Sequence, residues 1–301
     1  MFHEPQKIAV LMPLLIELNN LKRIKAANLN ETFAAEIFKR AWVDLINGAD
    51  LRKVALVTTA KSIAAVQLGA IDAEVLRNAG LSQNQTIGIL TRSFDSVASA
   101  IDEDLRRELR THLSQNFETN ADAPNFVEKL ARQPRAGATK KGAPRLVFEQ
   151  TENHAEHCFS VAIYAVLLAS FFQTNIETPF LTALVHHFHN ADLPDSGFAG
   201  EEMLGEFLPE VFQNLREQVL REIPESMREK ARNGFRLTET ADSPESKTFH
   251  AADVIDRVLQ VRHHAEINKF TMRYALEEME LVHEGAIQTF HHEVLRDAGI
   301  I

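Results

Sequence analysis

The stretch HAEHCFSVAIYAVLLASFF, residues 154–172, decides how this sequence folds. After Phe159 it is apolar on nearly every side of a helix, so no face is left for water. A helix of that composition is typical of the centre of a bundle, where other helices enclose it. The sequence therefore predicts a fold built around this segment.

Helical periodicity extends outward from this segment in both directions. On its amino-terminal side, apolar residues recur at intervals of three and four in ETFAAEIFKRAWVDLI, RKVALVTTAKSIAAVQLGAI and FDSVASAIDEDLRRELRTHL. On its carboxyl side, helices are expected for ETPFLTALVHHFHN, SKTFHAADVIDRVLQVRHHAEIN and FTMRYALEEMELVHEGAIQTFHHEVLRD. No run of alternating β-branched residues competes with them. The predicted fold class is all-α.

Polar residues ahead of two of these runs are candidate helix caps. Asn30 and Thr32 precede one run, and Ser93 with Asp95 precede another. Short oxygen-bearing side chains at such positions accept hydrogen bonds from the first free backbone N–H groups of a helix. We therefore expect helices to begin after both pairs.

Composition limits the class of protein. The chain has 301 residues, 45% hydrophobic and 25% charged, with a formal net charge of −10, as in a soluble globular protein that avoids broad contact with nucleic acid or anionic lipid. Its one cysteine, Cys158, excludes an internal disulfide and fits a reducing compartment. The apolar run from Ile8 to Ile16 is shorter than the ~20 residues of a bilayer span. We expect a buried helix there and a cytoplasmic protein.

The composition changes in QPRAGATKKGAPR, residues 133–145, which combines prolines, glycines and basic residues. Such a stretch cannot hold a regular helix and is typical of a linker or loop. We therefore predict a helical domain of residues 1–132, a linker of residues 133–146 and a second helical domain of residues 147–301. The first domain carries no catalytic motif.

Histidines gather at the start of the central helix and at the end of the next. On a helical wheel His157 shares the inward side with Val161 and Leu168. In the following helix the apolar residues leave His186 on the opposite side, with His187 and His189 on its flanks, facing a polar groove. Neighbouring imidazoles are good ligands for divalent transition metals. A buried neutral histidine, and a solvated helix end with histidines near its dipole, are the alternatives.

Three segments resemble the HD-domain superfamily of metal-dependent phosphohydrolases. RLVFEQTENHAEHCFSVAIYA looks like the segment with the first histidine, ALVHHFHNADLPD like the one with the His-Asp pair, and FHAADVIDRVLQ like the one with the last aspartate. The AEH and HAAD contexts are most similar to the 5'-deoxynucleotidase-like branch. The resemblance covers residues 144 to about 290 and implies an HD-type helical bundle with a bound metal ion.

The resemblance implies that His157, His186 and Asp253 are metal ligands, and it places His187 where the family has aspartate. An imidazole can still coordinate, but losing a carboxylate moves the preference from Mg²⁺ toward a divalent transition metal ion: Zn²⁺, Fe²⁺, Co²⁺, Ni²⁺ or Mn²⁺. On its own helical wheel Asp253 lies opposite the buried side, so periodicity alone predicts a solvated residue there. Asp256 is the alternative ligand.

The resemblance also implies residues that handle protons and substrate. Asn190 and Asp195 stand where the branch has its two catalytic acids, but asparagine cannot take a proton, so general acid or base work falls to Asp195. Arg145 corresponds to a phosphate-contacting arginine, with His154 as a further substrate contact. An ordinary turn at Asp195 and a water-facing basic linker at Arg145 are the alternatives.

The remaining histidines of the second half sit in charged amphipathic contexts, where exposed helix faces account for them. We expect exposure for His263, His264, His283, His291 and His292.

These features predict a metal-dependent phosphohydrolase acting on a phosphate monoester, with a nucleotide among the candidate substrates. Since His187 and Asn190 replace carboxylates, a catalytically divergent HD-fold ligand-binding or regulatory module is the alternative. An HD-fold iron oxygenase, with His189 as an added ligand, is a weaker one. The expected partner is a small molecule, with no bulk nucleic acid and no membrane, and amphipathic terminal helices leave a homodimer open.

Overall fold

A computed structural model of the chain describes residues 8–27, 29–115, 122–140, 146, 150–268, 271–278, 280–282 and 285–301. Within these residues the regular elements are helices, and no strand is formed beyond two isolated bridges, Pro134 to Asn153 and Ala138 to Leu146. The predicted all-α fold class is therefore confirmed.

The helices follow one another along the chain with short connections. They are α1 (Met12–Asn19), α2 (Phe33–Ile46), α3 (Leu51–Leu68), α4 (Ala73–Asn78), α5 (Gln83–Val97), α6 (Glu103–Thr111), α7 (Asn125–Arg132), α8 (His154–Leu168), α9 (Glu177–Val185), α10 (Gly197–Leu204), α11 (Leu208–Leu220), α12 (Glu225–Leu237), α13 (Pro244–Asn268) and α14 (Gln288–Asp297). Short 3₁₀ turns lie at η1 (Ile8–Val10), η2 (Asn20–Arg23), η3 (Ala98–Ala100), η4 (Phe188–Ala191) and η5 (Gly205–Phe207), and a π turn at η6 (Tyr274–Glu278).

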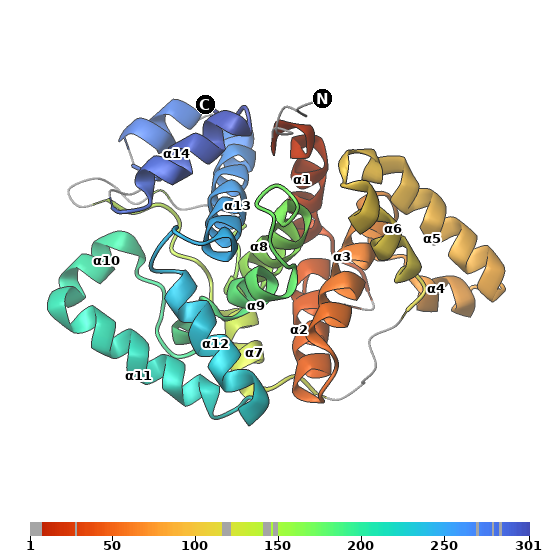
Figure 1. The fold of residues 1–301 in the computed structure, drawn as a ribbon, viewed down its shortest axis with the longest axis horizontal. Helices are drawn as coiled ribbons and strands as arrows, with labels where there is room; N and C mark the ends of the chain where they lie inside the picture. The colour runs from red at the N-terminus through yellow and green to blue at the C-terminus, as the bar shows by residue number, and fades with distance from the viewer. Residues whose placement is uncertain are drawn as a thin grey trace.

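Helix α8 is the centre of the molecule, as its composition predicts. Every residue of the helix is buried. It packs against α2, α3 and α7 on one side and against α9 and α13 on the other (Figure 1). A capping box fixes its start, because Asn153 and Glu156 each accept a hydrogen bond from the other's backbone N–H at 2.9 Å.

The two halves of the chain share one hydrophobic core. The apolar run that begins at Ile8 forms the buried turn η1 and helix α1, as expected, and the Tyr164 hydroxyl of α8 donates to the carbonyl oxygen of Leu15 in α1 at 2.7 Å. Residues 133–140 are hydrogen-bonded to the start of α8, through Arg135 N to Glu152 O at 2.8 Å and His154 N to Gln133 O at 3.1 Å. The division into domains stays a prediction.

Helix starts agree with one of the two expected caps. Thr32 accepts a hydrogen bond from the backbone N–H of Ala35 at the start of α2. The prediction for Ser93 and Asp95 is wrong, since both lie inside α5, where the Ser93 hydroxyl donates to the carbonyl of Ala64 in α3. The next helix begins instead after Asp102, which accepts from two backbone N–H groups at 3.1 Å. Periodicity does not mark this break because both sides of it are amphipathic.

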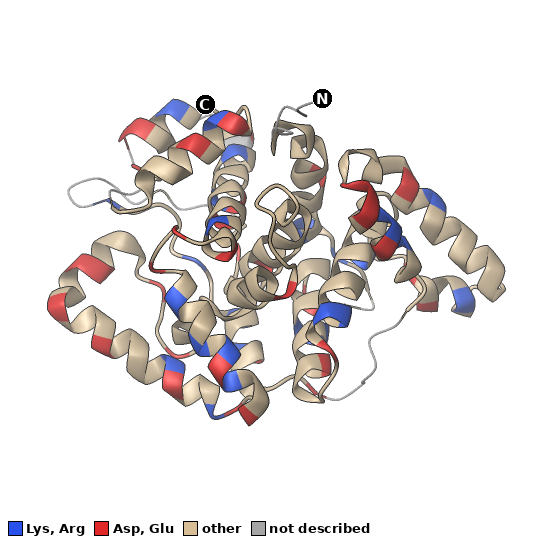
Figure 2. Cartoon of the chain, in the orientation of Figure 1, with Lys and Arg blue, Asp and Glu red and all other residues tan. Residues whose placement is uncertain are grey.

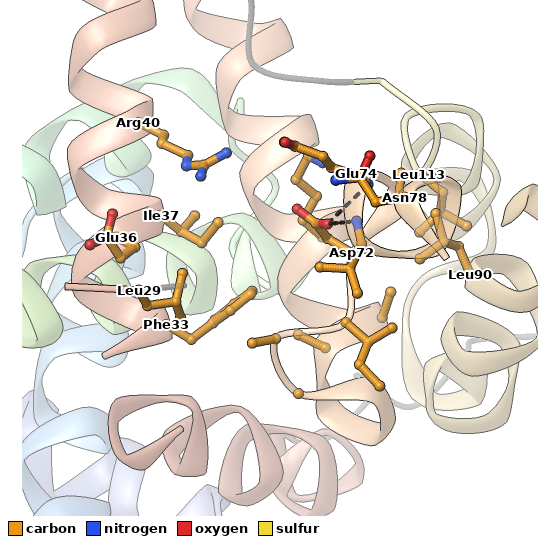
Figure 3. A pocket seen from close by; sticks show the side chains of 18 of the residues that line it. Leu29, Phe33, Glu36, Ile37, Arg40, Asp72, Glu74, Asn78, Leu90 and Leu113 are labelled. Atoms are coloured by element: carbon orange, nitrogen blue, oxygen red, sulfur yellow. Dashed lines mark hydrogen bonds between the residues drawn. The ribbon is translucent and has the colours of Figure 1, made fainter. Parts of the chain in front are cut away.

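The amino-terminal helices enclose a cavity of about 530 Å³ among α2, α3 and α4. Phe33 and Arg40 lie on one side of it, and Asp72 and Leu90 on the other (Figure 3). The Asp72 carboxylate accepts from two backbone N–H groups at the start of α4. None of the described residues that line this cavity is a histidine or cysteine, so it lies apart from the histidine cluster. Among the described residues, no helix has the length and apolarity needed to cross a bilayer.

Helix α12 approaches α9 closely at Gly234. A β-carbon there would lie 2.9 Å from Val185 Cγ2 and 3.3 Å from Thr182 Cα. We expect Gly234→Ala to lower the free energy of unfolding by about 1–2 kcal/mol, because overpacking exceeds the gain in helix propensity. Gly88 in α5 is exposed with nothing within 4 Å of such a carbon, so Gly88→Ala should raise it by about 0.5–1 kcal/mol. Urea denaturation measures both, and shifts of the same sign would contradict the close packing.

Candidate metal centre

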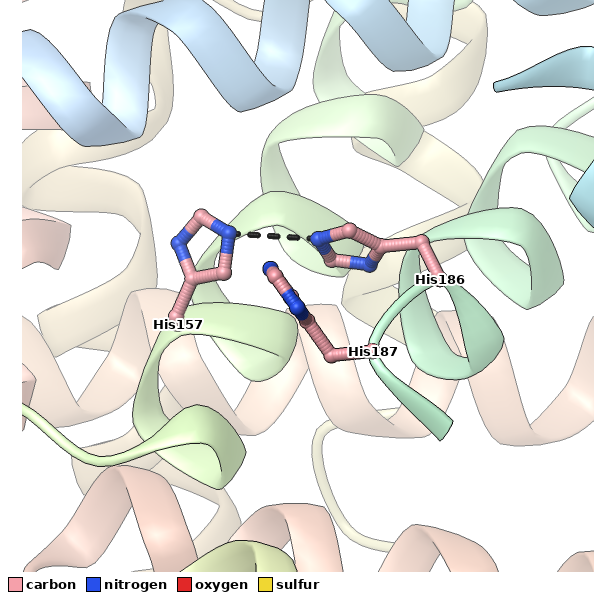
Figure 4. A group of neighbouring side chains, drawn as sticks. All are labelled: His157, His186 and His187. Atoms are coloured by element: carbon pink, nitrogen blue, oxygen red, sulfur yellow. Dashed lines mark hydrogen bonds between the residues drawn. The ribbon is translucent and has the colours of Figure 1, made fainter. Parts of the chain in front are cut away.

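Three elements bring the predicted metal ligands together. His157 lies at the end of the first turn of α8, His186 and His187 directly follow α9, and Asp253 lies in α13. Because α8 packs against both α9 and α13, the four side chains meet. Figure 4 shows the three imidazoles turned toward one another, with ring centroids 4.2 to 5.2 Å apart.

Hydrogen bonds on the outer side fix the orientation of two of these rings. Nδ1 of His186 lies 2.7 Å from the carbonyl oxygen of Ala183. Since a carbonyl only accepts, we assign the proton to Nδ1, which leaves a lone pair on Nε2. Nδ1 of His157 lies 2.8 Å from Asp256 Oδ2, so this ring also has its outer nitrogen bonded.

The inner nitrogen of His157 has two further possible ligand atoms beside it. Nε2 of His157 lies 3.2 Å from Nε2 of His186 and 3.2 Å from Asp253 Oδ1. Nε2 of His186 and Asp253 Oδ1 are acceptors, and both lie next to Nε2 of His157. Acceptor atoms this close to one another require a cation among them, either one shared proton or a metal ion. Two neighbouring ligands of a tetrahedral ion at about 2.0–2.1 Å are themselves about 3.3 Å apart, so the spacing fits a transition metal.

His187 completes the donor set. Its Nδ1 lies 2.8 Å from Asn190 Oδ1, and the amide nitrogen of Asn190 donates to the carbonyl of Leu193 at 3.1 Å. This bond leaves Nε2 of His187 as the acceptor nitrogen. Ligand atoms of His157, His186 and His187 all lie within 4.8 Å of one another. The three imidazoles can therefore surround one ion, and the Asp253 carboxylate lies next to the His157 ring.

The charge states of the cluster suit metal binding. Burial, together with the neighbouring His157 ring, lowers the pKa of the His186 imidazole to about 3. Burial also lowers the pKa of His187 well below its ordinary value. Burial opposes ionisation of Asp253, but the His157 ring and the Arg257 guanidinium outweigh it and hold the pKa of Asp253 well below its ordinary value. The cluster thus offers neutral His186 and His187 imidazoles and an ionised Asp253 carboxylate near neutral pH.

Of the predicted proton-handling and substrate residues, Asp195, Asn190 and His154 lie near this cluster. Asp195 is held by two backbone donors, Ala136 N at 2.9 Å to Oδ2 and Gly197 N at 2.8 Å to Oδ1. His154 Nε2 lies 3.6 Å from Asp195 Oδ2, too far for a hydrogen bond, and both ring nitrogens of His154 are buried without a hydrogen-bond partner among the described residues. The His154 ring lies 4.6 Å from that of His187.

A cavity of about 350 Å³ opens onto the cluster. This volume is in the range of small-molecule sites. Its polar lining includes His186, His187, Asn190, Asp195 and Asp253, and its apolar lining includes Phe198, Phe249, Leu281 and Ile287. Five of the predicted site residues therefore line one cavity, whereas His154 and His157 are not among its lining residues.

Arginine residues in the cavity differ from the sequence prediction. Arg145 lies outside the described residues. Arg135, which the sequence reasoning did not select, lines the cavity, and its buried Nη1 has no hydrogen-bond partner among the described residues, although Glu152 Oε2 is 3.7 Å away. Arg257 also lines it. Both arginines of the basic stretch precede the first histidine, and without helical periodicity nothing in the sequence ranks Arg135 above Arg145.

His189 does not join the cluster, which corrects the expectation that three imidazoles of this segment face one groove. Its ring stacks on Phe212 of α11, with centroids 3.8 Å apart. The turn η4 redirects the chain after His187, so helical spacing no longer holds there. His189 is therefore not placed to act as an added ligand.

The two aspartates of α13 take different places. Asp253 has a side chain only 15% exposed and faces the cavity, although its helical wheel predicts a solvated residue. Asp256 is fully buried behind His157. The wheel misleads because α13 is covered on most sides, by α8 and α9 on one and by the cavity residues on another.

The expected exposure of the remaining histidines is wrong for two of them. His264 is 2% exposed and His291 is 4% exposed, because α13 and α14 pack against each other and against the core. His291 also lines the cavity. His263 and His292 are partly exposed, and His283 lies outside the described residues.

A family model described as an HD domain matches residues 127–294, more than half of the chain. The chain therefore belongs to the HD-domain family, whose members typically bind divalent metal ions and which is part of the superfamily of metal-dependent phosphohydrolases. No curated protein and no solved structure matches it.

The geometry predicts that the purified protein binds about one divalent transition metal ion per chain. His186→Ala should bind only a small fraction of that amount, because it removes an inner nitrogen of the cluster. His189→Ala is the matched control, since its ring packs on Phe212, and should bind as the wild type does. Elemental analysis after incubation with Co²⁺ and desalting measures the content, and equal loading of the two variants would contradict the assignment.

Proposed function

We propose that this protein is a metal-dependent phosphohydrolase that cleaves a phosphate monoester, of the 5'-deoxynucleotidase-like kind. The observation that supports it most is the meeting of the His157, His186 and His187 imidazoles beside a cavity that Asp253 and Arg135 also line. Membership of the HD-domain family supports the same reaction class.

A divalent ion bound by His157, His186, His187 and Asp253 would polarise a phosphoryl oxygen and lower the pKa of a bound water. Side chains of the protein would bind the phosphate. Arg135 presents a guanidinium with an unused donor, and guanidinium groups match the geometry of phosphate oxygens. Arg135 would therefore hold the phosphate, with Arg257 adding positive charge from α13.

Proton transfer falls to Asp195 in this proposal. Its two backbone hydrogen bonds fix the carboxylate at the cavity wall, where it can exchange a proton with water or with the leaving oxygen. Asn190 uses its carbonyl oxygen on His187 and its amide on Leu193. Asn190 therefore positions His187 and takes no part in moving protons.

The organic part of the substrate would rest on the apolar wall of the cavity. Phe198, Phe249, Leu281 and Ile287 line it, and such a surface favours a flat, partly apolar group such as a nucleoside. The net charge of −10 argues against a nucleic-acid polymer, and Figure 2 shows acidic and basic residues interspersed along outer helices such as α6 and α12.

A homodimer and a cytoplasmic location stay proposals. Within the chain, α14 is tied to the amino-terminal turn by Ile8 N to Asp297 Oδ2 at 3.0 Å.

One observation favours a second function, ligand binding without turnover. His187 and Asn190, which replace two carboxylates of the family pattern, are bonded to each other. A site that has lost two acids can still bind a phosphate ester while hydrolysing it poorly. Nucleotide binding in calorimetry without phosphate release would support this function. The iron oxygenase alternative is weaker, since His189 packs on Phe212.

Loss of the Asp195 carboxylate should slow hydrolysis without changing metal binding. With Co²⁺, Zn²⁺ or Mn²⁺ added, we expect the wild type to release phosphate from a panel of nucleoside monophosphates. Asp195→Asn should lower kcat by about 10²–10⁴-fold while metal content is unchanged. Asp192→Asn is the control, because that carboxylate pairs with Lys129 at 2.5 Å. A metal-loaded wild type inert on the whole panel would refute hydrolysis of these esters.

Loss of the Arg135 guanidinium should weaken phosphate binding. We expect Arg135→Met to raise KM for the best nucleotide by about 10–100-fold, the effect of losing a hydrogen bond to a charged group. Arg132→Met is the matched control, since Arg132 is exposed and bonds only to the carbonyl of Glu128 among the described residues. Steady-state kinetics measure both, and an unchanged KM in Arg135→Met would remove this arginine from the proposed site.

A further inference from the structure

The candidate metal centre has an outer layer that reaches beyond the matched family region. Lys22 lies in η2, far from residues 127–294 in the sequence, and its side chain is only 2% exposed. Its ammonium nitrogen Nζ lies 2.6 Å from Asp256 Oδ1 and also donates to Glu152 Oε1. The amide nitrogen of Asn19 donates to the same Asp256 oxygen at 3.2 Å.

Asp256 links this amino-terminal pair to the cluster. Its Oδ1 accepts from Lys22 and Asn19, while its Oδ2 lies 2.8 Å from Nδ1 of His157. The carboxylate is fully buried, so these protein groups replace water as its hydrogen-bond partners. Both of its oxygens are therefore fixed from opposite sides.

The inner nitrogen of His157 depends on this arrangement. A carboxylate bonded to the outer nitrogen of a ligating histidine sets the ring orientation and the tautomer. Here the bond to Asp256 turns Nε2 of His157 toward His186 and Asp253. A rotation of Asp256 would move Nε2 of His157 away from His186 Nε2 and Asp253 Oδ1.

Lys22 also occupies a competing position. Glu152, His157 and Asp256 offer ligand atoms within 4.8 Å of one another, on the outer side of His157. The Lys22 ammonium bonds to both of these carboxylates and supplies the positive charge that they would otherwise draw from another cation. A metal ion is thereby directed to the inner side of His157.

We infer that Lys22 is a positioning residue of the metal centre, acting through Asp256 to aim His157 Nε2 at the ion. The inference rests on the proposed function, because it assumes that the cluster binds a metal. The amino-terminal half of the chain would then contribute a residue that sets the geometry of the site.

The test is a double-mutant cycle on Co²⁺ affinity in the full chain. Lys22→Met should weaken Co²⁺ binding by about 10–100-fold and change the visible Co²⁺ absorption, as loss of an outer-layer partner does. In an Asp256→Asn background the same substitution should change affinity by less than about 2-fold, because the path through Asp256 is already broken. Lys25→Met is the control, since Lys25 is exposed and forms no ion pair among the described residues.

A purely structural ion pair gives a different result. Circular dichroism establishes a temperature at which all variants are folded, and Co²⁺ titrations are made there. Wild-type affinity in folded Lys22→Met, or an equal loss in both backgrounds, overturns the inference. If Lys22→Met does not fold, Asn19→Ala is measured instead. This variant keeps the ion pair between Lys22 and Asp256, and we expect it to bind Co²⁺ several-fold more weakly than the wild type. Wild-type Co²⁺ affinity in Asn19→Ala overturns the inference. A wild type that binds no Co²⁺ overturns the proposed metal site as well, which separates the two failures.

Discussion

Burial of the polar first turn of α8 is the constraint on which the rest of the site depends. His154, Glu156 and His157 are inside the protein, where a polar group is costly unless it is bonded. The hydrogen-bond partners come from separate segments, since Thr32 donates to Glu156 at 2.6 Å and Asp256 bonds His157. Among the described residues His154 has no such partner, and Asp195 lies 3.6 Å from it. Satisfying Glu156 and His157 therefore brings together residues from the amino-terminal half and from α13.

The same constraint explains why the two halves of the chain share one core. Lys22 bonds to Glu152 and Asp256, and Thr32 bonds to Glu156, and removing Lys22 while the acids stay buried would cost about 3–5 kcal/mol. The amino-terminal helices therefore do more than cover α8. They neutralise acids that lie next to the metal ligands, and so couple the stability of the fold to the geometry of the site.

Sequence reasoning predicted the parts that follow from a local period or a motif. The all-α class and the enclosed α8 follow from composition, and the meeting of His157, His186, His187 and Asp253 follows from the resemblance. Helical wheels failed where tertiary packing decides: Asp253 faces the cavity, and His189 turns onto Phe212 after η4. Lys22 and Arg135 were missed because a single basic residue carries no local signal of its partner, which lies more than a hundred residues away for Lys22.

The imidazole of His187 sets the electrostatics of the candidate centre, and Asn190 is bonded to it. Nδ1 of His187 needs an acceptor, while the carbonyl of Leu193 needs a donor, and an asparagine amide supplies both where a glutamate could supply only the first. Asp253 is then the single carboxylate among the proposed ligands. A metal ion held by three neutral imidazoles and one carboxylate keeps more of its positive charge than one with two carboxylates, which would polarise a bound phosphate more strongly. In the proposed reaction Asn190 cannot accept a proton, so proton transfer would fall to Asp195.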